Sequence, residues 1–283
     1  MASSFSILSD IRSHGSRPMQ SIKPGLDGAP AFTTLVISNT PVTFGSGNIG
    51  RAAVNIVANR LLAMGATPRY LSVGASVDSD TSTSLISTVD AAMSDAAVQA
   101  EMEYASAQAR LIRDLPGGSG LILTATGVGE MPPDLSLEPG NILPGDVVIC
   151  TGPVGTFGTA VTAARSNLMA VIESADGNAL GDGIHELLRV VPRVRDLIFP
   201  ERGLNAALDE LRARQPGLIV CKDAVPVNPA VQAACEMLDL NAADMPCAGS
   251  MLAVVRGEDA ERALAALHRS AFCSEAAVIA RVE

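Results

Sequence analysis

Tryptophan is absent from this sequence, and aromatic residues make up only 3% of its 283 residues. The core is therefore expected to consist of aliphatic side chains and alanine. Hydrophobic residues reach 48%, yet no apolar run approaches the ~20 residues needed to cross a bilayer, so we expect no membrane-spanning segment. The N-terminus has no basic region followed by a long apolar stretch. This argues against a secretory signal and predicts a cytoplasmic protein.

Positive charge is also scarce, because 20 lysine and arginine residues stand against 30 acidic residues, for a net charge of −10. Phosphate contacts need clustered basic side chains, so we expect no binding to nucleic acid. The five cysteines are odd in number and widely spaced, without a CxxC or Cys/His pattern. They are expected to be mostly buried thiols, and no metal site is predicted.

Acidic residues are missing from one long segment, since no Asp or Glu occurs between Asp27 and Asp78. Within it, a glycine cluster precedes an apolar pattern of helical period, which Gly65 and Pro68 end. Glycines before a helix can cradle a phosphate at the helix N-terminus. They can equally do no more than permit a tight turn. The glycines of the cluster are Gly45, Gly47 and Gly50.

Alternating strand and helix patterns predict an α/β or α+β fold with two domains. Residues 1–30 are rich in Gly, Ser and Pro and are expected to form an arm. The proline-rich segment MPPDLSLEPGNILPGD separates the predicted domains 31–141 and 142–283. We expect strands at 33–43, 69–77, 120–128, 146–150, 218–221, 251–255 and 276–282. Helices are expected at 48–64, from about 156, and at 204–214, 228–238 and 260–268.

Two regions are harder to interpret from periodicity alone. Residues 81–113 carry apolar residues at helical spacing, so we expect a long helix. It either continues toward Leu111 or breaks and gives way to a short strand. Residues 176–202 are charged and only loosely patterned, and we assign no element there.

Three segments occur in an order that carries a resemblance. They are His14-Gly15-Ser16, the run FGSGNIGRAAVNIVANRLLAMGATPRYLSVG, and LPGDVV followed by TGPVGTFG. They are similar to the N-terminal glycine-rich segment, the helix FPGGNIGKLAV, and the PGD-VVV and Gly-Asp-His-Gly motifs of one family. That family is HypE, of the hydrogenase-maturation proteins, within the PurM-like superfamily of aminoimidazole-ribonucleotide synthetase.

The resemblance implies a homodimer of two-domain subunits. The N-terminal domains would form a dimer-spanning β-sheet or barrel, and the C-terminal domain would be α/β. It also implies ATP and Mg²⁺ in a cleft between the domains. HypE uses ATP to dehydrate a carbamoyl group on its C-terminal cysteine, which yields the cyanide ligand of nickel–iron hydrogenases.

The acidic positions that the resemblance implies carry other residues in this chain. The family's aspartates fall at Leu35, Arg60, Gln108 and Thr156, and its Asn-Glu-Gly motif falls at Cys247-Ala248-Gly249. The sequence ends without a cysteine. Mg²⁺ on a triphosphate needs hard oxygen ligands, typically carboxylates. We therefore expect no cofactor, and Mg-ATP only if these replacements do not mark a degenerate site.

Several residues remain candidates for a ligand site, each with a structural alternative. The glycines can serve only as turns, the asparagines as satisfied core amides, and Arg60 as a salt-bridge partner. Cys247 is the candidate catalytic thiol, or else an inert buried residue. The cleft candidates are Gly45, Gly47, Asn48, Asn59, Arg60, Gly155, Thr156 and Phe157, with His14, Gly15 and Ser16 in the N-terminal segment.

Three functions stay open. The first is a dimeric binding or accessory protein that has lost Mg-ATP chemistry, with a protein partner in hydrogenase or other metallocentre maturation. The second is an active ATP-dependent carbamoyl dehydratase. The third is a repurposed enzyme that acts on a small anionic substrate through Cys247, Arg60 and the asparagines.

Overall fold

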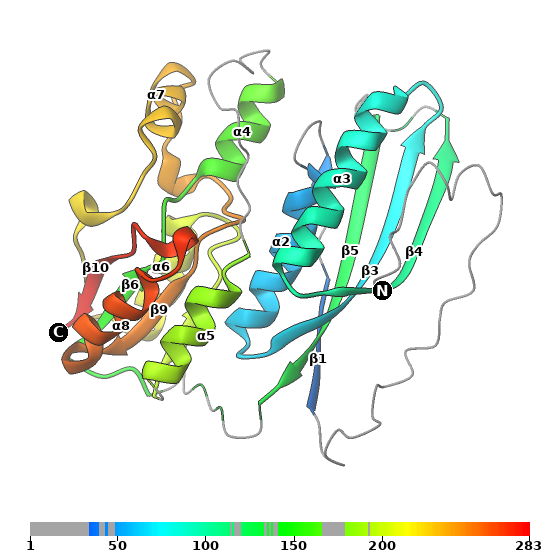
Figure 1. The fold of residues 1–283 in the computed structure, drawn as a ribbon. Coiled ribbons are helices and arrows are strands. Elements are labelled where there is room, and N and C mark those ends of the chain that lie inside the picture. The colour runs from blue at the N-terminus through cyan, green and yellow to red at the C-terminus, as the bar shows by residue number, and fades with distance from the viewer. Residues whose placement is uncertain are drawn as a thin grey trace. The chain divides into compact units, whose positions relative to one another are not determined.

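The computed structural model describes residues 34–39, 43–44, 49–113, 115, 120–132, 135, 137, 141–165, 179–191 and 193–283. The chain divides into two compact units, coloured in sequence order in Figure 1. The first unit holds Met1–Leu61 and Ala66–Pro133, and the second holds Leu62–Gly65 and Asp134–Glu283. The predicted second domain, residues 142–283, lies wholly within the second unit.

The first unit is built on one five-stranded sheet in the order β1-β5-β3-β4, with β2 also paired to β5. β3 and β4 are parallel, and the other pairs are antiparallel. Two parallel neighbours need a crossover connection, usually a helix, and α3 (Thr83–Gln99) lies between these two strands in the chain. The elements are β1 (Thr34–Asn39), β2 (Thr43–Phe44), α2 (Ile49–Ala63), β3 (Thr67–Asp78), α3 (Thr83–Gln99), β4 (Glu103–Ile112) and β5 (Leu121–Met131).

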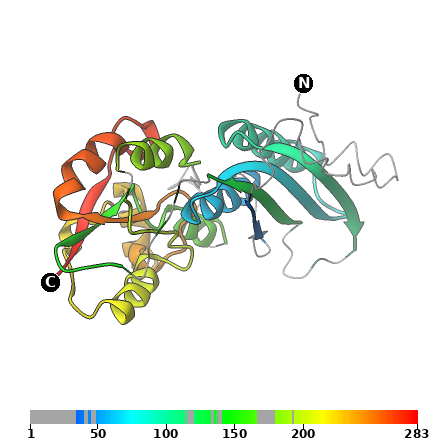
Figure 2. The same ribbon diagram turned by 90° about the horizontal axis from the view of Figure 1, so that it is seen from below.

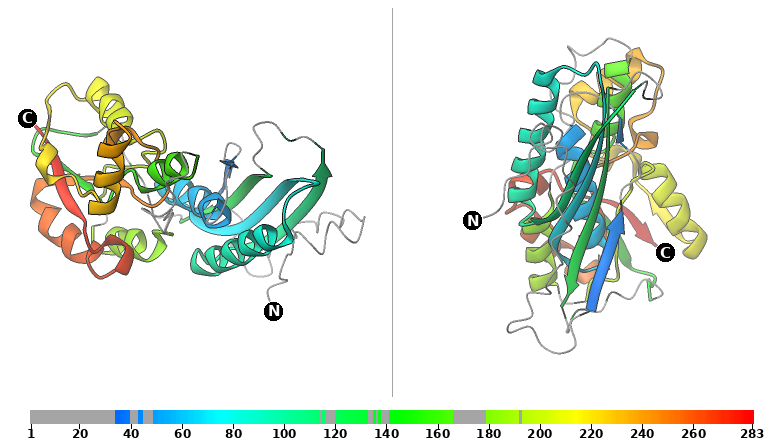
Figure 3. Two further views of the ribbon diagram at one scale, coloured as in Figure 1. Left: turned by 90° about the horizontal axis from the view of Figure 1, so that it is seen from above. Right: turned by 90° about the vertical axis from the view of Figure 1, so that its right-hand side faces the viewer.

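Helices α2 and α3 pack on one face of this sheet (Figure 3). A Cβ atom added at Gly127 would lie 2.2 Å from Val57 Cγ1 of α2, so glycine lets this helix approach the sheet closely. A Cβ atom at Gly50 would lie 2.4 Å from the carbonyl oxygen of Val89, so the two helices are also in close contact. Strand β5 alternates buried and half-buried residues, as a sheet covered on one face requires.

The second unit contains a five-stranded sheet in the order β7-β9-β6-β10-β8, in which all pairs are antiparallel. Helices cover both of its faces, as Figure 2 shows. Its strands are β6 (Asp146–Cys150), β7 (Asp196–Ile198), β8 (Leu218–Val220), β9 (Leu252–Arg256) and β10 (Ala277–Val282). Its helices are α4 (Thr156–Arg165), α5 (Gly181–Val190), α6 (Leu204–Arg214), α7 (Pro229–Met237) and α8 (Ala260–Leu267), with 3-10 turns at Lys222–Ala224, Ala242–Asp244, Gly257–Asp259 and Ala271–Cys273.

Alternate residues of these strands belong to two different apolar clusters. Ile149, Ala253 and Val255 pack with residues of α5 and α8, such as Leu187 and Leu267. Their neighbours along the strands join a second cluster with the apolar face of α6. The aliphatic and alanine-rich core expected from the composition follows from this packing.

The fold class predicted from the sequence is confirmed. Residues 81–113 form a helix and then a strand, so the alternative with a break is correct. Helix α3 ends at Gln99, and Glu101 takes a positive φ of 54° before β4 begins. The loosely patterned region 176–202 contains α5 and β7, which the sequence analysis missed. No helix of the described residues is long and apolar enough to cross a membrane.

Candidate functional site

The glycine-rich turn between β6 and α4 brings two predicted site residues together. Gly155 has a φ of +78°, and an added Cβ atom would lie 2.3 Å from the carbonyl oxygen of Ala242. The turn therefore requires glycine for both its conformation and its packing. The backbone N–H of Gly155 donates to the sulfur of Cys247 at 3.4 Å. Thr156 and Phe157 follow as half-buried residues at the start of α4.

The segment Asn241–Cys247 covers this turn. The carbonyl oxygen of Pro246 accepts a hydrogen bond from the N–H of Gly158 at 2.9 Å. Pro246 and Cys247 thus accept hydrogen bonds from the N–H groups of two glycines of this turn. The glycine-rich turn is thus held by contacts within the protein, which favours the structural alternative for Gly155.

The Cys247 side chain is buried, with only 2% of its surface exposed. Its thiol lies 3.6 Å from the carbonyl oxygen of Met245. Burial raises the pKa of this thiol, and the hydrogen bond from Gly155 opposes the shift only in part. The Ser250 hydroxyl lies near this thiol but meets hydrogen-bond geometry with no residue that the structure describes. A protonated, buried thiol is a poor nucleophile, so the arrangement disfavours Cys247 as a catalytic residue.

The same segment also meets the N-terminus of α6. Gly203 precedes this helix with a φ of +103°, and an added Cβ atom would lie 2.8 Å from the carbonyl oxygen of Asp244. The Asp244 carboxylate accepts a hydrogen bond from Asn205 Nδ2 at 2.7 Å. Because α6 has no acidic residue in its first turn, Asp244 places the negative charge that this helix end favours.

Helix α2 of the first unit carries the predicted amide and arginine. Asn59 is fully buried, Arg60 is half-buried, and each has a polar or electrostatic interaction within the chain. Asn55, one turn earlier, is also fully buried. These residues belong to the first unit, whereas Gly155, Thr156 and Cys247 belong to the second. Candidates outside the described residues are His14, Gly15, Ser16, Gly45, Gly47 and Asn48.

A polar sheet surface that the sequence analysis missed lies on the face of β3, β4 and β5 opposite α2 and α3. Ser72, Gly74 and Ser76 of β3 alternate with buried residues, so their side of the strand faces away from the core. Ser72 and Ser106 hydroxyls share a hydrogen bond of 2.5 Å. We name this surface the open face; no described helix packs on it. The sequence signal for this surface was the alternation of the small residues Ser72, Gly74 and Ser76 with apolar residues along one strand.

The middle of the open face is uncharged. Across β4, β3 and β5 the register aligns Ser106, Ser72 and Thr126 in one row. The next row is Gln108, Gly74 and Thr124. Gln108, where the resemblance implies an aspartate, therefore lies beside other neutral groups.

Two carboxylates of the first unit make local contacts. Asp78, at the end of β3, accepts a hydrogen bond from the N–H of Leu115 at 2.8 Å, and this bond is the main reason that its pKa is lowered. Glu130 lies 3.3 Å from Arg69. In the part of the chain that the structure describes, no group of three His, Cys, Asp or Glu residues could hold a metal ion.

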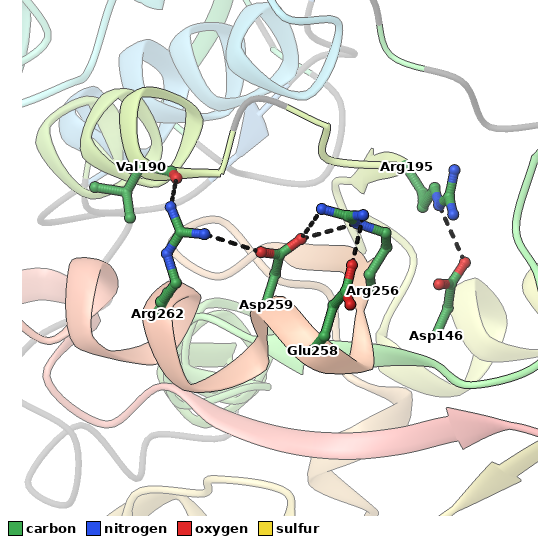
Figure 4. Close-up of polar contacts among 7 residues, drawn as sticks. All are labelled: Asp146, Val190, Arg195, Arg256, Glu258, Asp259 and Arg262. Carbon is green, nitrogen blue, oxygen red and sulfur yellow. Dashed lines mark hydrogen bonds and ion pairs between the residues drawn. The ribbon is translucent and has the colours of Figure 1, made fainter.

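Ion pairs concentrate at one end of the second sheet, where β6 begins and β9 ends (Figure 4). Asp146 lies 3.2 Å from Arg195. The buried Asp259 carboxylate lies 2.8 Å from Arg256 and 3.2 Å from Arg262, and Arg262 also donates to the carbonyl oxygen of Val190 at 2.7 Å. These contacts connect α8 with the end of α5, and we assign them to stability.

Known proteins resemble this chain in sequence. Residues 21–131 match the family described as AIR synthase related protein, N-terminal domain. Carbamoyl dehydratase HypE of Azotobacter vinelandii is 32% identical over 247 residues, which cover 86% of this chain and 72% of the relative. The protein of the same name from Cupriavidus necator is 30% identical over 246 residues, which cover 86% of this chain and 70% of the relative.

Solved structures resemble it in fold. E. coli HypE, a hydrogenase maturation protein, superposes with a TM-score of 0.79 at 27% identity, covering 98% of this chain and 90% of that chain. HypE in complex with ATP gives a TM-score of 0.78 at 26% identity, with 98% and 85% covered. Thiamine-monophosphate kinase from Stenotrophomonas maltophilia shares the fold, with a TM-score of 0.65 at 18% identity over 90% and 84% of the two chains. The chain belongs to the HypE family of hydrogenase maturation proteins, within the AIR synthase related proteins.

Proposed function

We propose that this HypE-family protein has lost Mg-ATP chemistry and works as a dimeric binding or accessory protein in the cytoplasm. Its pathway would be hydrogenase or other metallocentre maturation, with a protein partner. The observation that carries this proposal is the neutral centre of the open face, where Gln108 lies among hydroxyl groups and Gly74. A site of this composition has no carboxylate to offer a divalent cation.

Charge on α2 supports the proposal. The preserved Asn59 is followed by Arg60, where the resemblance implies an aspartate. A guanidinium is itself a cation, so it repels a divalent metal ion instead of binding it. An anion without a metal remains compatible with Arg60.

In the second unit, the glycine-rich turn before α4 supports the same conclusion. The resemblance implies Gly-Asp-His-Gly at Gly155-Thr156-Phe157-Gly158, and this chain has neither the acid nor the histidine. The N–H groups of Gly155 and Gly158 bind Cys247 and Pro246 instead. These donors are therefore committed to packing.

Calorimetry with Mg-ATP tests the proposal, combined with an assay for released phosphate. We expect no binding at micromolar nucleotide and no hydrolysis, while a relative named carbamoyl dehydratase HypE serves as the positive control. Micromolar affinity for Mg-ATP together with hydrolysis of ATP would contradict the proposal. Binding of ATP alone, with and without Mg²⁺ at equal affinity, would agree with a metal-free anion site at Arg60.

A second candidate function is an active ATP-dependent carbamoyl dehydratase. The identity of 32% to the Azotobacter vinelandii enzyme favours it. Intact-mass spectrometry after incubation with the maturation substrates would reveal a carbamoylated or cyanated cysteine if this candidate is correct. An unmodified mass, with a modified relative as control, supports the accessory role.

A further inference from the structure

We draw no further inference here: the strongest candidate, the cluster of the buried Ser250 hydroxyl and the Cys247 thiol beside the N-terminus of α4, belongs to the site already described.

Discussion

The N–H of Gly155 donates to the sulfur of Cys247 across 3.4 Å, and this contact joins residues 92 positions apart in the sequence. It fastens the turn before α4 to the segment Asn241–Cys247. The contact explains why a glycine-rich turn and a thiol occur together without forming a reactive site. The glycine provides the conformation and the donor, and the buried sulfur provides the acceptor.

Replacing Gly155 by alanine should destabilise the protein. Alanine is strained at a φ of +78°, and its methyl group would lie 2.3 Å from the carbonyl oxygen of Ala242. We expect a loss of about 2–4 kcal/mol in the free energy of unfolding, measured by urea denaturation. Gly181→Ala is the control, because an added Cβ atom there meets nothing within 4 Å. Equal effects of the two substitutions would contradict the assigned role of the turn.

Thiol labelling should distinguish the exposed cysteine from the buried ones. Cys221 is exposed, whereas Cys150, Cys235, Cys247 and Cys273 are buried. Burial raises the pKa of Cys150 to about 12 and that of Cys273 to about 11. With a chromogenic disulfide reagent at pH 8 we expect one fast thiol, which Cys221→Ser removes. Fast labelling of Cys247 would restore it as a catalytic candidate.

Removal of the Asp259 carboxylate should cost more than removal of its exposed neighbour. The Asp259 side chain is 6% exposed and pairs with both Arg256 and Arg262, while Glu258 is 68% exposed and pairs with Arg256. Since both arginines are partly solvated, we expect Asp259→Ala to lower the free energy of unfolding by about 1–3 kcal/mol. Glu258→Ala should stay within about 0.5 kcal/mol. Similar values for both variants, measured by denaturant unfolding, would show that burial of Asp259 does not matter.

Acid should weaken the link between α5 and the end of α8. Hydrogen bonds from Arg189 lower the pKa of Glu186 to about 2, and Arg269 adds to the shift. A carboxyl whose folded pKa is depressed stabilises the protein above its unfolded pKa near 4.5. The stabilisation is lost as pH falls through that value toward 2. We expect the melting temperature of Glu186→Gln to fall less than that of the unchanged protein between pH 6 and pH 2.5. Parallel curves for the two proteins would contradict this link.

Local patterns were sufficient for much of the fold. A helix was predicted at 204–214, and α6 spans Leu204–Arg214 with Leu204, Leu208 and Leu211 buried on one face. Residues 146–150 were likewise predicted as the strand that β6 forms. Such elements bury one regular face, so their periodicity is visible in a single sequence.

The missed elements had weaker local signals. Helix α5 contains Gly181 and Gly183 near its start, which lower helix propensity. Its Ile184 and Leu187 are buried through packing against α8 and the sheet, which a single sequence does not show. Strand β4 was one of two alternatives left open by the sequence, because it follows α3 without a proline or a glycine to mark the change; pairing with β3 decided its conformation.

Residue identity alone established the family frame and the replacement of aspartates by Arg60, Gln108 and Thr156, because charge is a property of the side chain wherever it lies. Burial and neighbours are not local properties. Only the folded chain placed Cys247 beneath the turn at Gly155, where low polarity keeps its thiol protonated. Only strand register placed Ser72 and Ser106 side by side on one open face, since that depends on which segments pair across the sheet.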